Sequence, residues 1–160
     1  MPTIIQKIIS MKKFFLFLLL NLAGVIFLYG QNNTVADHHR KAITFLIDQY
    51  SEAREKRDTA LLKTILSADE DQLVSTGEWR NGIGTAVQGM LKSSASSPGT
   101  RTLKVDKIRM LTPATAIVDC KYEIQNTDST MRRMWSVFIV VVEKEAWKIS
   151  AIRNMLPASQ

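Results

Sequence analysis

The stretch WSVFIVVVE, from Trp135 to Glu143, contains an unbroken apolar run over Val137–Val142. A strand with one face in water alternates apolar and polar residues, so this strand needs cover on both faces. Helices can cover only one face, and we expect a second copy of the sheet to cover the other. The alternative is that the chain's own termini cover it. The residues divide by parity into two sets: Trp135, Val137, Ile139 and Val141, and Phe138, Val140 and Val142.

The sequence around this strand predicts an antiparallel meander. Residues 118–125 alternate between apolar and polar, and Ala116 continues the apolar face. EKEA turns the central strand into a final one that carries Trp147, Ile149 and Ala151. Upstream, Leu103 and Val105 differ in parity from Ile108 and Met110. A β-bulge near Asp106 and Lys107 would restore one apolar face.

The first half of the chain is predicted to be mainly helical. A helix over Ala36–Lys56 would place Ile43, Leu46, Ile47 and Tyr50 on one face. Asp58 can cap a second, short helix, and a third is expected near Ile83–Lys92. DQLVSTGEWRNG predicts a short strand and a turn, and SSASSPGT a loop. Helices followed by antiparallel strands indicate the α+β class.

Residues 1–30 have the layout of a secretory signal peptide. Lys12 and Lys13 precede an apolar segment over Phe14–Val25, and Gly30 supplies a small residue at its end. The apolar part is shorter than the ~20 residues that span a bilayer, so we expect cleavage rather than a membrane anchor. The mature protein, residues 31–160, would then be periplasmic or secreted. Met11 is an alternative start, which would leave residues 1–10 outside the protein.

Composition excludes several classes of function. The net charge of +6 includes Lys7, Lys12 and Lys13, and removing them leaves 18 basic residues against 15 acidic ones, a charge of +3. This is too weak to favour nucleic acid as a partner. A single cysteine, Cys120, cannot form an internal disulfide, and its parity places it in the core. No cofactor is expected.

The chain resembles the NTF2-like superfamily, in particular its SnoaL-like and ketosteroid-isomerase-like members. The resemblance rests on AITFLIDQYSEAREKRDTALLKTIL, GEWRNGIGTAV and EAWKISAIRN, and covers residues 36–155. It implies a cone in which N-terminal helices pack into a strongly curved antiparallel sheet, with a pocket at the open end. It also implies a homodimer through the convex face of the sheet.

The isomerase chemistry of that family transfers poorly to this chain. It needs a carboxylate base and hydrogen-bond donors for the enolate oxygen. The resemblance puts Tyr50 at the position of the donor tyrosine. It puts Ser75 or Thr76 at the position of the base, and the second donor acid near Phe138. We therefore expect no catalytic residues.

Candidate ligand-binding residues are aromatic or charged side chains near the expected pocket. Arg153 shares parity with Trp147 and Ile149, so it should point to the apolar side, where its charge needs Asp71, Glu78 or an anionic ligand as partner. Other charged groups are predicted to be solvated: Arg54, Lys56 and Arg57, Arg132 and Arg133, and the turn Asp69–Asp71. We expect no metal site. The candidates for a ligand site are Tyr50, Trp79, Asp119, Tyr122, Trp135 and Arg153.

The sequence thus favours an exported, non-catalytic domain that binds a small, largely apolar molecule in a cone-shaped pocket. One alternative is a SnoaL-like enzyme that transfers a proton on a ring-bearing substrate. Another is a structural dimer whose cone is filled by its own side chains.

Overall fold

The computed structural model describes residues 36–96 and 98–157. The predicted signal peptide lies outside these residues, so export stays a prediction. Contacts divide the chain into Met1–Arg40 and Lys41–Gln160, and the second unit carries the sheet and its covering helices. Within the described ranges, no helix combines the length and the apolar character that crossing a membrane requires.

The helices agree with the periodicity of the sequence except at one end. Residues 36–56 are helical, and the part over residues 41–56, the first helix, buries the predicted face of Ile43, Leu46, Ile47 and Tyr50. Helix α2 (Thr59–Ile65) is capped by Asp58, whose Oδ1 accepts a hydrogen bond from the Leu61 backbone N–H at 2.9 Å. Helix α3 (Gly82–Ser96) continues into the serine-rich segment that was predicted to be a loop.

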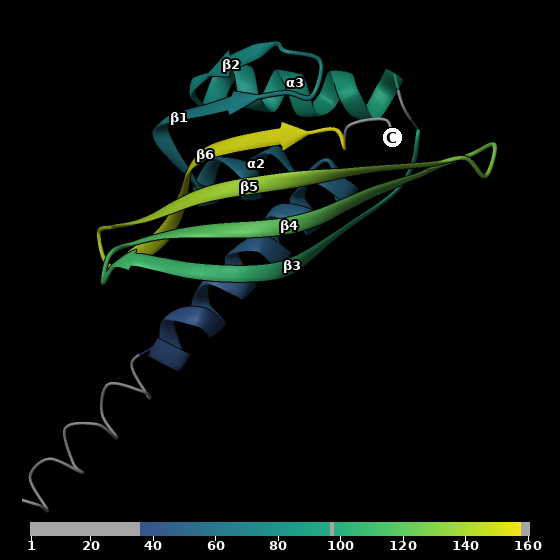
Figure 1. Cartoon of the computed structure of the whole chain (residues 1–160). Helices are drawn as coiled ribbons and strands as arrows, with labels where there is room; N and C mark the ends of the chain where they lie inside the picture. The colour runs from purple at the N-terminus through teal and green to yellow at the C-terminus, as the bar shows by residue number, and fades with distance from the viewer. Residues whose placement is uncertain (1–35, 97, 158–160) are drawn as a thin grey trace, which may run out of the picture. The chain divides into compact units, whose positions relative to one another are not determined.

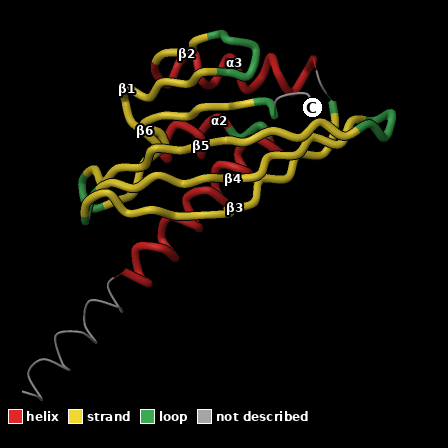
Figure 2. Tube along the Cα trace, viewed as in Figure 1, coloured by secondary structure: helices red, strands yellow, loops and turns green. Residues whose placement is uncertain are grey.

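Six strands form one mixed sheet in the order β2-β1-β6-β5-β4-β3 (Figure 1). The predicted meander is present and antiparallel throughout, but β1 pairs with β6 in parallel, which the sequence pattern did not predict. Figure 2 shows the three long strands β3, β4 and β5 side by side, with the helices on one face. The strands are β1 (Leu66–Leu73), β2 (Trp79–Asn81), β3 (Gly99–Thr112), β4 (Thr115–Asn126), β5 (Met131–Glu143) and β6 (Ala146–Met155).

The two faces of the sheet differ in burial. The inner face packs on the first helix, and on β5 it carries Phe138 and Val140, which have no exposed surface. The ring of Tyr50 meets Phe138 edge-on, with centroids 5.2 Å apart. The outer face of β5 carries the other parity set: Trp135, Val137, Ile139 and Val141. Cys120 is fully buried on the inner face, and burial raises the pKa of its thiol to about 12.

Two register shifts adjust which residues face inward. The bulge predicted near Asp106 is confirmed, because the pairing of β3 with β4 shifts between Val105 and Lys107. A second shift interrupts the pairing of β5 with β6 between Ile139 and Val140. It leaves Ile149 paired with inward Val140, and Ala151 paired with outward Ile139. The second shift therefore reverses the parity of every β6 residue beyond it.

Candidate functional site

The inner face of the sheet and the first helix enclose a cavity with two connected chambers, which we call the arginine cavity. The inner chamber has a cavity volume of about 20 Å³ and the outer chamber one of about 80 Å³, so the outer chamber is the larger. Both chambers are lined by Arg54, Arg101, Tyr122 and Asn154, so the two adjoin. The inner chamber is also lined by Tyr50, Ser51, Leu103 and Ser136. The outer chamber adds Gln72, Val74, Ser75, Arg80, Ser93, Ile124, Arg132 and Met134.

Arg54 lies in the last turn of the first helix, four residues after Tyr50. One terminal nitrogen donates to the Ser93 hydroxyl at 2.9 Å, and the other lies 3.4 Å from the Tyr50 hydroxyl. Its Nε is buried and has no hydrogen-bond partner. Burial raises the pKa of Tyr50, although the Arg54 charge opposes the rise. The Tyr50 hydroxyl is therefore a neutral donor beside the guanidinium.

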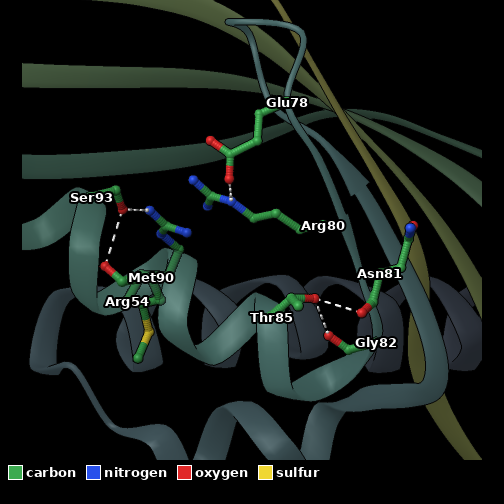
Figure 3. Close-up of polar contacts among 8 residues, drawn as sticks. All are labelled: Arg54, Glu78, Arg80, Asn81, Gly82, Thr85, Met90 and Ser93. Atoms are coloured by element: carbon green, nitrogen blue, oxygen red, sulfur yellow. Dashed lines mark hydrogen bonds and ion pairs between the residues drawn. The ribbon is translucent and has the colours of Figure 1, made fainter.

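Arg80 enters the cavity from the short strand β2, and its residue is only 7 % exposed. Its Nε donates to Glu78 Oε1 at 3.0 Å. The guanidinium lies directly on α3, because a Cβ at Gly89 would be 2.5 Å from the Arg80 Cζ. Only a glycine leaves room for it there. Figure 3 shows the side chains of Arg54 and Arg80 pointing into the same space.

Arg101 and Arg132 come from the starts of β3 and β5. Arg101 donates to the carbonyl oxygens of Gly99 and Ser93 at 3.1 and 3.2 Å. Arg132 donates to the Ser75 hydroxyl at 2.7 Å. Ser75 is one of the two residues, with Thr76, that the family resemblance placed at the position of the catalytic base. Of the residues that line the two chambers, four are arginine and none is Asp, Glu or His.

A buried carboxyl, Glu70, lies on the inner face of β1, two residues before Gln72. It has no exposed surface, and neither carboxyl oxygen has a hydrogen-bond partner. Burial, with a smaller contribution from the Asp71 carboxylate, raises the pKa of Glu70 to about 7, although Arg153 and Arg80 oppose the rise. The prediction that Asp69–Asp71 form a solvated turn is wrong, because all three belong to β1.

Two of the six predicted site residues, Tyr50 and Tyr122, line the cavity. Trp79 and Trp135 are 53 % and 37 % exposed. Asp119 lies on the outer face beside outward-facing Val137. The prediction that Arg153 points to the apolar side is wrong, because the register shift in β6 turns it outward with Val137.

Arg153 has the partner that was expected for it, on the other side of the sheet. Its two terminal nitrogens donate to the two carboxylate oxygens of Asp71 at 2.8 and 3.1 Å. Its guanidinium also lies over the ring of Trp79, 4.8 Å from the centroid. This pair belongs to the outer face and contributes nothing to the cavity.

Two arginines of the cavity, Arg54 and Arg132, were missed because they were assigned to solvated ends of elements, and no role was predicted for Arg80 or Arg101. For Arg54 and Arg132 that prediction is wrong, whereas their neighbours Lys56 and Arg133 are exposed as expected. The sequence contains a pattern that indicates that the side chains of Arg54 and Arg132 point inward. Arg132 shares its face with Met134 and Ser136, and Arg54 continues the helical face of Ile47 and Tyr50.

Among the described residues, no group of three or more His, Cys, Asp or Glu side chains could hold a metal ion. The charge of the cavity therefore comes from its arginines.

The same arrangement of helices and sheet occurs in several solved structures. A cystatin-like protein of unknown function from Nostoc punctiforme superimposes with a TM-score of 0.68 at 16 % identity, over 75 % of this chain and 78 % of that one. An NTF-2 like protein of unknown function from Shewanella oneidensis gives 0.63 at 18 %, over 72 % and 98 %. The chain has the NTF2-like fold.

A third similar structure has a name that refers to an enzyme. A ketosteroid isomerase-like protein from Erwinia carotovora atroseptica gives a TM-score of 0.65 at 11 % identity, over 74 % of this chain and 96 % of that one. Identities this low establish the NTF2-like fold alone. No protein-family model and no curated protein matches the chain.

Proposed function

We propose that this NTF2-like domain binds a small anionic molecule in the arginine cavity. The observation that carries the proposal is the convergence of four guanidinium groups on one cavity whose lining contains no carboxylate. They come from the first helix, β2, β3 and β5. The fold brings them together, because they are far apart in the sequence. The sequence led us to expect a largely apolar ligand, whereas the proposed ligand carries a negative charge.

The contacts of the arginines support an anionic ligand. Glu78 partly balances Arg80, but the hydrogen bonds of Arg54 and Arg132 described above go to hydroxyl groups. A guanidinium in a partly buried site is costly unless its charge is compensated. A bound carboxylate, phosphate or sulfate would accept charge-assisted hydrogen bonds and supply that compensation.

The same lining favours binding over proton transfer. General acid–base catalysis needs a titratable group within hydrogen-bond reach of the substrate. Of the two residues expected at the base position, Ser75 and Thr76, neither is an acid, and Ser75 accepts a hydrogen bond from Arg132. The other polar lining groups are hydroxyls and amides, which hold a ligand but do not take a proton from carbon at neutral pH.

The test is calorimetric titration of the protein with sulfate, acetate and benzoate at low ionic strength. We expect Arg132→Gln to weaken anion binding by about 10- to 100-fold, the effect of losing one charge-assisted hydrogen bond. The matched control is Arg133→Gln, which removes the same charge from the next residue. Arg133 points outward to Glu123, and its side chain is 68 % exposed. No anion binding by the wild type, or equal losses in both variants, would refute the proposal.

A further inference from the structure

We infer that the arginine cavity takes up its anion together with one proton, and that the carboxyl group of Glu70 holds that proton. This inference rests on the proposed function and deepens it by stating how the same site responds to pH. The observation behind it is a fully buried carboxyl, without a hydrogen-bond partner, next to one of the arginines of the cavity.

The pairing of β1 with β2 places Glu70 beside Arg80. Gln72 of β1 lies opposite Arg80, and Glu70 is two residues before Gln72, so Glu70 is the diagonal neighbour of Arg80 on the inner face. Diagonal neighbours are about 7–8 Å apart, within reach of two long side chains. Gln72 and Arg80 both line the outer chamber. Glu70 therefore lies directly behind the wall of the cavity.

The surroundings of Glu70 leave its proton in balance with neutral solution. Burial favours the neutral carboxyl, and Asp71 on the same strand acts in the same direction. Arg153 on β6 and Arg80 on β2 favour the charged form, but their hydrogen bonds go to Asp71 and Glu78. The result is a pKa of about 7 for Glu70.

The helices contribute two further groups. Burial raises the pKa of Tyr50 on the first helix, and a charge on Glu70 adds to this rise. Lys92 is the one charged side chain of α3, and it is exposed. Since Tyr50 lines the inner chamber and Arg80 the outer chamber, the charge of Glu70 acts on both.

A bound anion and an ionised Glu70 oppose each other. Both are negative, and the guanidinium of Arg80 attracts both. An anion in the cavity therefore raises the pKa of Glu70 further, and by reciprocity ionisation of Glu70 lowers the affinity for the anion. At a pH between the pKa of the free protein and that of the complex, each anion that binds brings a proton to Glu70.

The test is calorimetric titration with sulfate, which stays doubly charged over this range, at pH 6, 7 and 8.5 and constant ionic strength. We expect the affinity of the wild type to fall by about tenfold from pH 6 to pH 8.5. Titrations near pH 7.5 in two buffers of different ionisation enthalpy should show uptake of a fraction of a proton per sulfate. Glu70→Gln should abolish this uptake and keep the affinity constant. His38 and His39 remain in the variant, so any protons that they take up remain too.

Glu78→Gln is the matched control, because it removes a carboxylate from Arg80 without removing Glu70 (Figure 3). The hydrogen bond from Arg80 holds the pKa of Glu78 below its usual range, so Glu78 stays charged at every pH of the test. Its loss should strengthen sulfate binding equally at the three pH values and leave the pH dependence as in the wild type.

The outcomes separate this inference from the proposed function. If sulfate binds in a way that depends on Arg132 but takes up no proton, the inference is wrong and the anion site stands. The same holds if Glu70→Gln retains the proton uptake of the wild type. If sulfate binds at no pH, both are wrong.

A second measurement decides if Glu70→Gln does not fold by circular dichroism. Carbon-13 NMR titration of the Glu70 carboxyl in the wild type, with and without saturating sulfate, gives its pKa in both states. We expect a higher pKa with sulfate bound, and equal values would overturn the inference.

Discussion

Glu70 shows how one residue can link pH to stability in this fold. Its carboxyl is fully buried and has no hydrogen-bond partner, so the neutral form suits its surroundings better than the charged form. The charged groups that act on it are Asp71 on its own strand, Arg80 on β2 and Arg153 on β6. The two arginines are not sufficient to offset burial, and the net result is a raised pKa.

We predict that Glu70 makes the protein less stable as pH rises. The folded-state pKa of about 7 lies above the ordinary 4.5, so the folded protein holds this proton more strongly than the unfolded chain does. Its contribution is fully present below pH 4.5, falls as pH rises towards 7, and is lost above that. At about 1.4 kcal/mol per pKa unit, the loss over the whole range is about 3–4 kcal/mol.

The measurement is urea unfolding of the wild type and Glu70→Gln between pH 4.5 and 8.5. The free energy of unfolding should fall by about 3 kcal/mol less in the variant, because glutamine does not titrate. Asp69→Asn is the control, since Asp69 is the exposed neighbour on β1. Parallel curves for the wild type and Glu70→Gln would contradict the prediction.

At the scale of elements, two glycines inside α3 differ in their surroundings, and one of them permits the contact of this helix with Arg80 of β2. Gly89 faces the Arg80 guanidinium, whereas a Cβ at Gly84 would meet nothing within 4 Å. Both lie inside α3, where a glycine costs up to about 1 kcal/mol relative to alanine. Gly89 therefore permits the close approach of Arg80 at some expense in helix stability.

We predict that Gly89→Ala weakens anion binding without unfolding the protein. The new methyl group pushes the Arg80 guanidinium away, which is possible because that group ends a flexible side chain. The anion affinity should fall by about tenfold, with little change in stability, because better helix propensity offsets the displaced contact. Gly84→Ala, the control in the same helix, should stabilise by about 0.5–1 kcal/mol and leave affinity unchanged. Titration and thermal unfolding test both variants, and unchanged affinity in Gly89→Ala would place Arg80 outside the site.

Local patterns predicted most elements of the fold but not their long-range pairing. The face of the first helix, the Asp58 cap and the bulge after Val105 each depend on a few neighbouring residues, and all are confirmed. The parallel pairing of β1 with β6 joins segments about 80 residues apart, and no local period encodes it. The helical end of α3 was missed because its serines lack an apolar period. Ser94 is nevertheless 3 % exposed, so tertiary packing determined the outcome.

The candidate site was harder to predict than the fold because one β6 register shift moves a charge across the sheet. Period-2 alternation through Trp147, Ile149 and Ala151 placed Arg153 inside, and the bulge places it outside. For Arg54 and Arg132 the error had the opposite direction. They were predicted to face solvent, because arginines at the ends of elements are usually solvated, and they line the cavity instead. Where an element ends at the rim of a cavity, its parity determines whether the last charged residue points inward.

At the scale of the whole molecule, the outer face of the sheet leaves large apolar side chains exposed, among them Trp135. The outward set on β5 continues onto Met155 of β6, which is 47 % exposed beside Trp135. Large exposed apolar patches on soluble proteins commonly mark interfaces. We therefore expect two copies to pair through this face, which would answer why β5 is apolar on both sides.

We predict that Ile139→Lys and Val140→Lys give opposite results, although the residues are adjacent. Ile139 faces outward, so its lysine should leave the fold intact and separate the dimer, because an unpaired charge in an interface costs several kcal/mol. Val140 has no exposed surface and belongs to the core, so its lysine should unfold the chain. Sedimentation reports assembly and circular dichroism reports folding for both variants. A wild type that stays monomeric at high concentration, or an Ile139→Lys variant that stays dimeric, would show that β5 is covered in another way.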